Sequence, residues 1–185
     1  MTLENATTGT TTIRTLSNQD FEEFDALRRH SLVTNPESFW ASEHEEAPER
    51  RKKFEDTNAH PDNFSIGAFV DDQLVGKMAF IRYEQEKLSF KGFIVGVYVH
   101  PNFRGLGLAK AILVETLNKA FAQQGLTKII LNVTATQVSA KRLYEKHGFK
   151  EFGFEKEGMQ ANGRHYDQYY LDLSKEDWLD LRKLS

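Results

Sequence analysis

The stretch that decides the fold is residues 96–109, GVYVHPNFRGLGLA, which passes from a strand pattern to a helix pattern. Apolar, β-branched and aromatic residues from Phe93 to Val99 predict a buried strand over residues 91–99. Pro101 cannot donate to a sheet ladder, so we expect the strand to end before it. From Leu108 the apolar residues recur with a helical period, which predicts a helix that ends near Gln124.

The turn between this strand and this helix has a composition that suits phosphate binding. Gly105 and Gly107 remove side chains where the backbone turns, so its N–H groups can point outward together. Free N–H groups and the dipole at a helix N-terminus attract phosphate, and Arg104 adds a cation that forks onto phosphate oxygens. The turn therefore predicts a pyrophosphate site, with a tight packing turn as the plainer alternative.

Two familiar nucleotide-binding loops do not fit these residues. A P-loop needs Gly-x-x-x-x-Gly-Lys-Ser/Thr, and no Lys-Ser/Thr pair follows the glycines. A dinucleotide fingerprint needs Gly-x-Gly-x-x-Gly, and Lys110 stands where the third glycine belongs. The expected ligand is therefore a different nucleotide-bearing molecule.

The composition is that of one ordinary soluble domain. The chain has 185 residues, of which 39% are hydrophobic and 28% are charged. A net charge of −3 gives no reason to expect nucleic acid, and no apolar run is long enough to cross a membrane. Residues 1–12 lack the pattern of a signal peptide, so we expect a cytoplasmic protein. The absence of cysteine excludes disulfides, thiolate zinc sites and a cysteine nucleophile.

The chain in order alternates strand and helix patterns, with no repeat or dividing linker. Residues 1–9 are expected to form a disordered tail and residues 10–185 a single domain. The expected strands are residues 10–16, 64–70, 74–83, 91–99, 128–134, 150–159 and 164–173. The expected helices are residues 18–32, 48–57, 108–124 and 136–147, and a short one that Ser174 caps. This order predicts an α/β (α+β) domain with a mixed sheet.

Tyr144 is the first candidate for catalysis. It lies on the helix after strand 128–134, four residues before Gly148 and Phe149. A core aromatic residue is the plain alternative for a tyrosine at this spacing. Its position favours a functional role, because the strand before its helix would adjoin the central strand of the sheet. A phenol there suits a general acid, since its pKa near 10 is close to that of an alkanethiol leaving group.

Several other polar and aromatic residues have both a functional and a purely structural interpretation. None of the six histidines forms a pair at metal spacing, so no zinc site is expected, and His100 and His165 are the two worth locating. Glu43, Glu45 and Glu46 are candidates for the entrance of a cationic substrate or belong to a solvated loop. Asp167 is a candidate base or amine anchor, or a plain strand residue. Phe39 and Trp40 wall a pocket or pin their loop to the core.

Two motifs carry a resemblance to a known family. The first, Arg/Gln-x-x-Gly-x-Gly/Ala after Val-x-Val-x-Pro, is filled by Arg104, Gly107 and Ala109 after Val97, Val99 and Pro101. The second motif is Leu-x-Val-x-x-x-Asn-x-x-Ala-x-x-Leu-Tyr-x-x-x-Gly-Phe. This sequence has Leu131, Val133, Gln137, Ala140, Leu143, Tyr144, Gly148 and Phe149 at its positions. Together the two motifs resemble the GNAT superfamily of acetyl-CoA-dependent N-acetyltransferases. One departure is Gln137, where the family usually has an asparagine that often contacts the pantetheine arm of coenzyme A.

The resemblance implies a fold and a set of binding residues. The fold is a single GNAT-like domain whose mixed, mostly antiparallel sheet of about seven strands splays between the fourth and fifth strands, with helices on both faces. The pyrophosphate of acetyl-CoA, the cosubstrate, would be held by Arg104, Gly105, Leu106, Gly107, Leu108 and Ala109. The pantetheine would pair with Val97, Tyr98 and Val99 as an added strand, and would contact Gln137 and Tyr144.

The resemblance also implies a direct transfer. A backbone N–H, for example that of Tyr98 or Val99, would polarise the thioester carbonyl, an effect of roughly 3 kcal/mol per well-placed donor. The amine would attack with no acyl-enzyme, and Tyr144 would protonate the departing thiolate. The base stays open, because the strand over residues 91–99 contains no carboxylate. Tyr98, Asp167 and an ordered water are the alternatives.

The sequence thus predicts an enzyme that moves acetyl from acetyl-CoA to a primary amine of a small metabolite or a protein N-terminus. Its partners would be the amine acceptor alone, without nucleic acid or membrane, and the protein would be a monomer or a homodimer. A catalytically silent acyl-CoA-binding regulatory module is the alternative, which the missing carboxylate favours. A nucleotide-phosphate enzyme is a weaker third possibility, since both phosphate-loop fingerprints fail.

Overall fold

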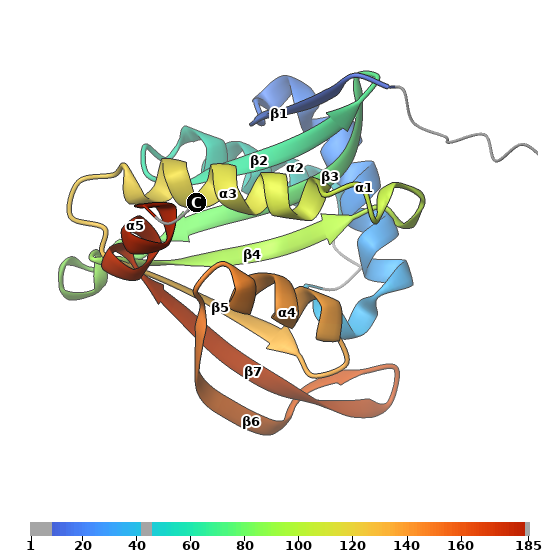
Figure 1. Cartoon of the computed structure of the whole chain (residues 1–185). Helices are drawn as coiled ribbons and strands as arrows, with labels where there is room; N and C mark the ends of the chain where they lie inside the picture. The colour runs from blue at the N-terminus through green and yellow to red at the C-terminus, as the bar shows by residue number, and fades with distance from the viewer. Residues whose placement is uncertain (1–8, 42–45, 184–185) are drawn as a thin grey trace, which may run out of the picture.

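A seven-stranded sheet in the order β1-β2-β3-β4-β5-β7-β6 runs through the protein (Figure 1). The structure is a computed structural model that describes residues 9–41 and 46–183. Its strands are β1 (Thr11–Thr15), β2 (Phe64–Val70), β3 (Gln73–Arg82), β4 (Lys91–Val99), β5 (Lys128–Thr134), β6 (Lys150–Ala161) and β7 (Arg164–Ser174). Its helices are α1 (Phe21–Thr34), α2 (Ala47–Ala59), α3 (Leu108–Phe121), α4 (Val138–Lys146) and α5 (Lys175–Lys183). All neighbouring strands are antiparallel except β4 and β5.

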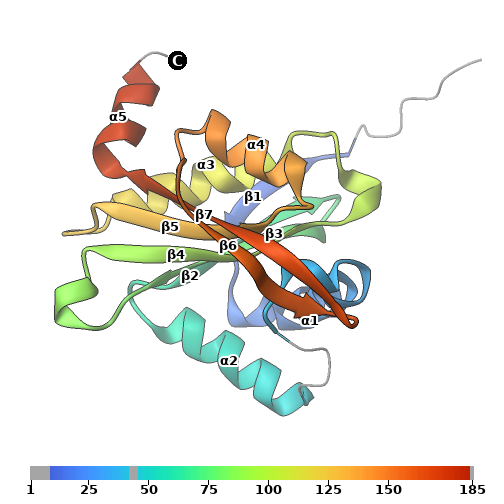
Figure 2. The same cartoon turned by 90° about the horizontal axis from the view of Figure 1, so that it is seen from below.

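Helices cover both faces of this sheet, with α3 and α4 on one face and α1 and α2 on the other (Figure 2). The apolar stripe of α3 lies in the main core, where Ile112, Leu113 and Leu117 are at most 1% exposed. A second cluster joins α1 and α2 to the opposite face, with the rings of Phe21 and Phe54 5.7 Å apart. The predicted fold class, a mixed sheet between two layers of helices, is confirmed.

The two central strands part along their length. β4 and β5 are paired from Lys91 with Lys128 to Phe93 with Ile130, and no further. β4 stays paired with β3 as far as Val99. Residues 94–99 therefore have no strand on their β5 side, which is the splay expected between the fourth and fifth strands.

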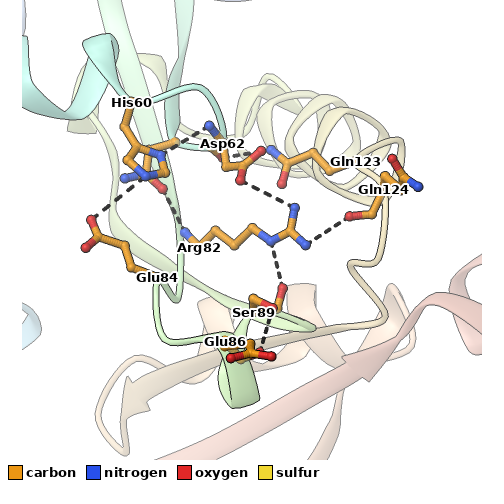
Figure 3. A network of polar contacts seen from close by, with 9 residues as sticks. His60, Asp62, Arg82, Glu84, Glu86, Ser89, Gln123 and Gln124 are labelled. Atoms are coloured by element: carbon orange, nitrogen blue, oxygen red, sulfur yellow. Dashed lines mark hydrogen bonds and ion pairs between the residues drawn. The ribbon is translucent and has the colours of Figure 1, made fainter.

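The closed end of this splay is held by Arg82 of β3, as Figure 3 shows. Its guanidinium donates to the carbonyl oxygens of Ser89 at 2.7 Å and Gln124 at 2.9 Å, and lies 3.5 Å from the Asp62 carboxylate. These contacts tie together the loop before β4, the segment after α3 and the turn before β2. The Arg82 side chain is only 12% exposed, so water does not readily replace its hydrogen bonds.

Most element ends differ from the sequence prediction by one to three residues. The helix expected from residue 136 begins at Val138, because the Gln137 N–H closes a turn on the Thr134 carbonyl at 2.8 Å. The last two strands extend to Ala161 and Ser174. Residues 1–8 of the expected tail lie outside the described residues. Within the described ranges, no helix is long and apolar enough to span a membrane.

Replacing Arg82 with leucine is expected to lower the free energy of unfolding by about 2–3 kcal/mol, because two carbonyl groups lose their charged donor. Denaturant unfolding followed by circular dichroism measures this change. Arg164→Leu makes the same chemical change at an exposed position of β7, where an effect within about 0.5 kcal/mol is expected. Equal losses from the two substitutions would contradict the role given to Arg82.

Candidate active site

A bulge in β4 gives its backbone an unusual direction beside the splay. The register with β3 shifts between Lys77 and Ala79, and Gly96 has φ +63°. Glycine takes this left-handed conformation at little cost, unlike a residue with a side chain. The Gly96–Val97 peptide is trans, so its C=O and N–H groups point in opposite directions.

Past the bulge, β4 turns backbone groups toward the open side. The His100 N–H donates to the Val75 carbonyl of β3 at 2.8 Å. Because backbone groups alternate along a strand, Val99 faces the other way, toward the splay. Arg104 Nε meets the Val99 carbonyl there at 3.0 Å, which anchors this arginine at the mouth of the splay.

The glycine turn forms a backbone cradle in front of α3. Gly105 and Gly107 have φ +82° and +78°, and a Cβ built on either would meet nothing within 4 Å. The first bond of α3 runs from the Ala111 N–H to the Gly107 carbonyl at 3.0 Å. The N–H groups of the three residues between them therefore have no acceptor inside the helix.

A cavity of about 920 Å³ joins this cradle to the far side of β4. One end is lined by Arg104, Gly105, Gly107, Leu108, Ala109 and Lys110, and the other by Phe24, Arg28, Leu32, Phe39, Trp40 and Lys77. Val97, Tyr98, Val99, Gln137 and Tyr144 line it between these ends. With the exception of Leu106, which is 46% exposed, every binding residue expected from the sequence lies along this cavity.

Tyr144 of α4 is buried, with its ring packed edge-on against Phe149 at 5.7 Å. Its hydroxyl makes no hydrogen bond to any residue in the described part of the chain. Burial raises the pKa of Tyr144 above its ordinary value, so the phenol stays protonated at neutral pH. The arrangement offers the cavity a proton donor that the protein itself does not engage.

Tyr98 has a structural contact that its sequence position did not indicate. Its hydroxyl lies 2.9 Å from both His30 Nδ1 and Thr34 Oγ1, so it pins the C-terminal part of α1 to β4. The His30 ring in turn packs on His100 with centroids 4.6 Å apart. Burial, with the nearby His30 and Arg104 charges, lowers the pKa of His100.

A chain of buried and half-buried polar side chains places the loop after α1 against β5. Asn132 donates to Gln168 at 2.7 Å, Gln168 donates to Thr134 Oγ1 at 2.8 Å, and Thr134 donates to the Glu37 carbonyl at 2.6 Å. The Gln137 amide donates to the Glu37 carboxylate at 2.9 Å. Gln137 thus lies at the cavity but its amide nitrogen already has a partner. Sequence reasoning missed this chain, because its members come from three separate segments.

Lys77 is the other residue that the sequence did not single out. It lies on β3 opposite Tyr98, is 4% exposed, and donates from Nζ to the Gly96 carbonyl at 2.9 Å. Burial, and secondarily the charge of Arg28, lower the pKa of Lys77 to about 7. From the sequence alone, a lysine in a strand with alternating apolar and polar residues is expected to be exposed to solvent. Its burial becomes apparent only from the packing of α1 over β3.

Several candidates lie away from the cavity. The Asp167 carboxylate accepts the Glu157 N–H at 2.9 Å, which is a structural contact at the β6 irregularity. His165 is half exposed and lies 3.8 Å from Glu157. Glu46 is exposed and does not line the cavity, and Glu43, His44 and Glu45 lie outside the described residues. Among residues 9–41 and 46–183, no aspartate or glutamate lines the cavity.

The splayed sheet, the cradle at the start of α3 and the cavity between them define an N-acetyltransferase class of protein. Residues 24–149 match the Acetyltransferase (GNAT) family, and the chain belongs to that family. The uncharacterized N-acetyltransferase YnaD of Bacillus subtilis (strain 168) is 23% identical over 164 residues, which cover 86% of this chain and 92% of YnaD.

Solved structures share the fold at low sequence identity. One is yncA, a putative acetyltransferase from Salmonella typhimurium with its cofactor acetyl-CoA, with a TM-score of 0.80, 17% identity, and coverage of 89% of this chain and 94% of that one. Another is a spermidine N-acetyltransferase SpeG chimera from Vibrio cholerae and hSSAT, with a TM-score of 0.76, 22% identity, and coverage of 92% and 98%. These likenesses support the fold assignment.

Lys77→Met is expected to stabilise the protein at pH 6.5 by about 1–3 kcal/mol, net of one lost hydrogen bond. The folded-state pKa is lowered to about 7, whereas the unfolded lysine binds its proton up to about 10. The cost of burial is therefore full below pH 7 and declines as the pH rises from 7 toward 10. Denaturant unfolding of both proteins across this pH range measures the difference in their free energies of unfolding. A difference that stays constant with pH would contradict the lowered pKa of the buried lysine.

Proposed function

We propose that this protein transfers the acetyl group of acetyl-CoA to a primary amine on a small metabolite or a protein N-terminus. The observation that carries the proposal is the parting of β4 and β5 directly beside the glycine cradle. A single cavity connects the two, so one extended ligand reaches both. Membership of the family and the acetyl-CoA in the yncA structure support the same ligand.

The residues of the cavity fit the parts of coenzyme A. The empty space over Gly105 and Gly107 suits a pyrophosphate, which the backbone N–H groups of Leu108 and Ala109 and the Arg104 guanidinium would bind. The edge of β4 at Val97 and at the Val99 N–H has no strand partner on its β5 side and suits the amides of a pantetheine arm, which would add to the sheet as a strand. Acetyl-CoA supplies an activated thioester in this site.

Two groups of this chain would assist the transfer. A β4 N–H in the neighbourhood of the bulge stabilises the charge that develops on the carbonyl oxygen, worth roughly 3 kcal/mol. The amine attacks directly, which agrees with the absence of cysteine from the sequence. Tyr144 gives its proton to the leaving sulfur, because its phenol stays protonated and the residue lines the cavity.

The acceptor would occupy the part of the cavity that borders α1 and the loop after it. The rings of Phe24, Phe39 and Trp40 and the basic side chains of Arg28 and Lys77 line it. Spermidine N-acetylation is the activity named for one structural neighbour, and it is a property of that protein. A catalytically silent binding module is the second candidate, and thiol release from acetyl-CoA across a panel of amines separates it from an enzyme. Stabilisation by acetyl-CoA without turnover of any amine would favour the silent module.

Tyr144→Phe is expected to lower kcat at least about 100-fold, because the leaving thiolate loses its proton donor. Binding of coenzyme A, measured by calorimetry, should change little. Tyr83→Phe is the matched control, since Tyr83 packs on Phe93 at the closed end of the splay. Full turnover by Tyr144→Phe with a weakly reactive amine would rule out the general-acid role.

Gly107→Ala is expected to weaken coenzyme A binding at least about tenfold, because a Cβ enters the space assigned to the pyrophosphate. The left-handed backbone adds a stability cost of roughly 1–2 kcal/mol. Gly163→Ala carries the same strain, with φ +72° and nothing near its Cβ, but lies at the β6–β7 turn. Calorimetry should therefore show unchanged affinity for Gly163→Ala. Equal losses of affinity in both variants would contradict the cradle.

A further inference from the structure

The proposed reaction needs a group that removes a proton from the acceptor. An alkyl ammonium cannot attack until it is neutral, and the pKa of such an amine is near 10. Histidine and carboxylate side chains are the common bases for proton removal, yet no described histidine, aspartate or glutamate lines the cavity. Asp167 is engaged elsewhere, and the Tyr98 hydroxyl is held between His30 and Thr34.

Lys77 lies where such a base is needed. Its Nζ is 2.9 Å from the Gly96 carbonyl, so it sits directly against the β4 bulge. The aromatic rings of Phe24 and Phe39 lie 5.3 and 5.6 Å from Nζ, and together they form a wall of the part of the cavity assigned to the acceptor. The Val97 N–H of the same peptide points away from Lys77. One peptide unit therefore separates the lysine from the strand edge assigned to the thioester.

The surroundings of Lys77 favour its neutral form. On α1, Arg28 faces it, while Glu23 is turned away to accept the Leu74 N–H at 2.8 Å. On β4, Tyr98 is the titratable neighbour, and its hydroxyl is already bonded. No carboxylate in the described part of the chain forms an ion pair with Lys77. Burial and Arg28 lower its pKa to about 7, so a large share of the molecules carry a free lone pair at neutral pH.

From this geometry we propose that Lys77 is the general base of the reaction, which takes a proton from the acceptor ammonium in the part of the cavity walled by Phe24 and Phe39. The inference rests on the proposed acetyl transfer. Lys77 Nζ keeps one N–H on the Gly96 carbonyl and presents its lone pair to the acceptor.

The step balances as follows. The acceptor nitrogen arrives as an ammonium and loses two protons in all. Lys77 takes the first, which frees the lone pair that forms the new C–N bond to the acetyl carbon. The C–S bond breaks and the sulfur takes the Tyr144 proton, which the second proton from nitrogen replaces. Lys77 then releases its proton to solvent. The net products are an amide, a thiol and one proton.

A purely electrostatic role is the competing account. A permanently charged Lys77 would polarise the Gly96 carbonyl and strengthen the Val97 N–H as a donor without moving a proton. Arginine keeps that charge but cannot act as a base near neutral pH, whereas methionine removes both functions. The two accounts therefore predict opposite results for Lys77→Arg.

The experiment compares the parent protein, Lys77→Met, Lys77→Arg and the control Lys119→Met. Lys119 also lies over an aromatic ring, Phe64 at 4.9 Å, but does not line the cavity. Each protein is first tested for acetyl-CoA binding by calorimetry. Thiol release is then measured from pH 6 to 10 with an alkyl amine and with an arylamine, which is already neutral at pH 7.

For the parent, kcat/KM with the alkyl amine should rise with pH through a midpoint of about 7. With the alkyl amine, kcat/KM of both Lys77 variants should be about 100-fold below that of the parent at pH 7, and the difference should shrink as the pH approaches that amine's own pKa. With the arylamine, kcat/KM of both variants should fall by less than about fivefold. Lys119→Met should match the parent.

Two results would overturn the assignment of Lys77. One is Lys77→Arg within about threefold of the parent with the alkyl amine. The other is an equal loss with alkyl amine and arylamine by both variants. A parent protein that binds acetyl-CoA but turns over no amine would refute the proposed transfer itself, and the base with it.

Discussion

The structure depends on where the parallel pairing of β4 and β5 stops. Pairing ends at Phe93 with Ile130, and Arg82 holds the strands together behind that point. In front of it, the β4 backbone has a sheet partner on one side and a cavity on the other. Backbone polar groups need partners, so this edge is suited to a ligand that carries amides. The glycine cradle lies at the same end because α3 starts directly after β4.

A second constraint is that β4 borders the cavity on two sides, the side of Lys77 and the side of the splay. The Gly96 bulge turns a carbonyl toward Lys77 and the opposite N–H away from it. The aromatic wall of α1 and its following loop stands on the lysine side, fixed by Tyr98 to α1 and by the Asn132–Gln168–Thr134 chain to β5. Donor and acceptor can therefore approach the same peptide from different directions, which is the arrangement that direct transfer needs.

Much of the fold could be predicted from local patterns. The period of α3, the proline after β4 and the glycine turn are written in consecutive residues, and the structure confirms the elements they indicate. The bulge and Lys77 could not be predicted in this way, since burial of a lysine depends on α1 packing across β3. The Asn132–Gln168–Thr134 chain joins residues 36 and 34 positions apart, so no local pattern reveals it. The expected roles of Tyr144 and the cradle residues remain predictions that the geometry supports.

The most direct test of this account is amide hydrogen exchange by NMR, with and without acetyl-CoA. The account predicts that acetyl-CoA slows exchange at Val97 and Val99 of β4 and at Leu108 and Ala109 of the cradle. Amides of the β2–β3 ladder, such as Ile66, serve as the internal reference and should not change. Protection confined to other parts of the protein, or no protection on the open side of β4, would contradict the claim that the splay binds the cosubstrate.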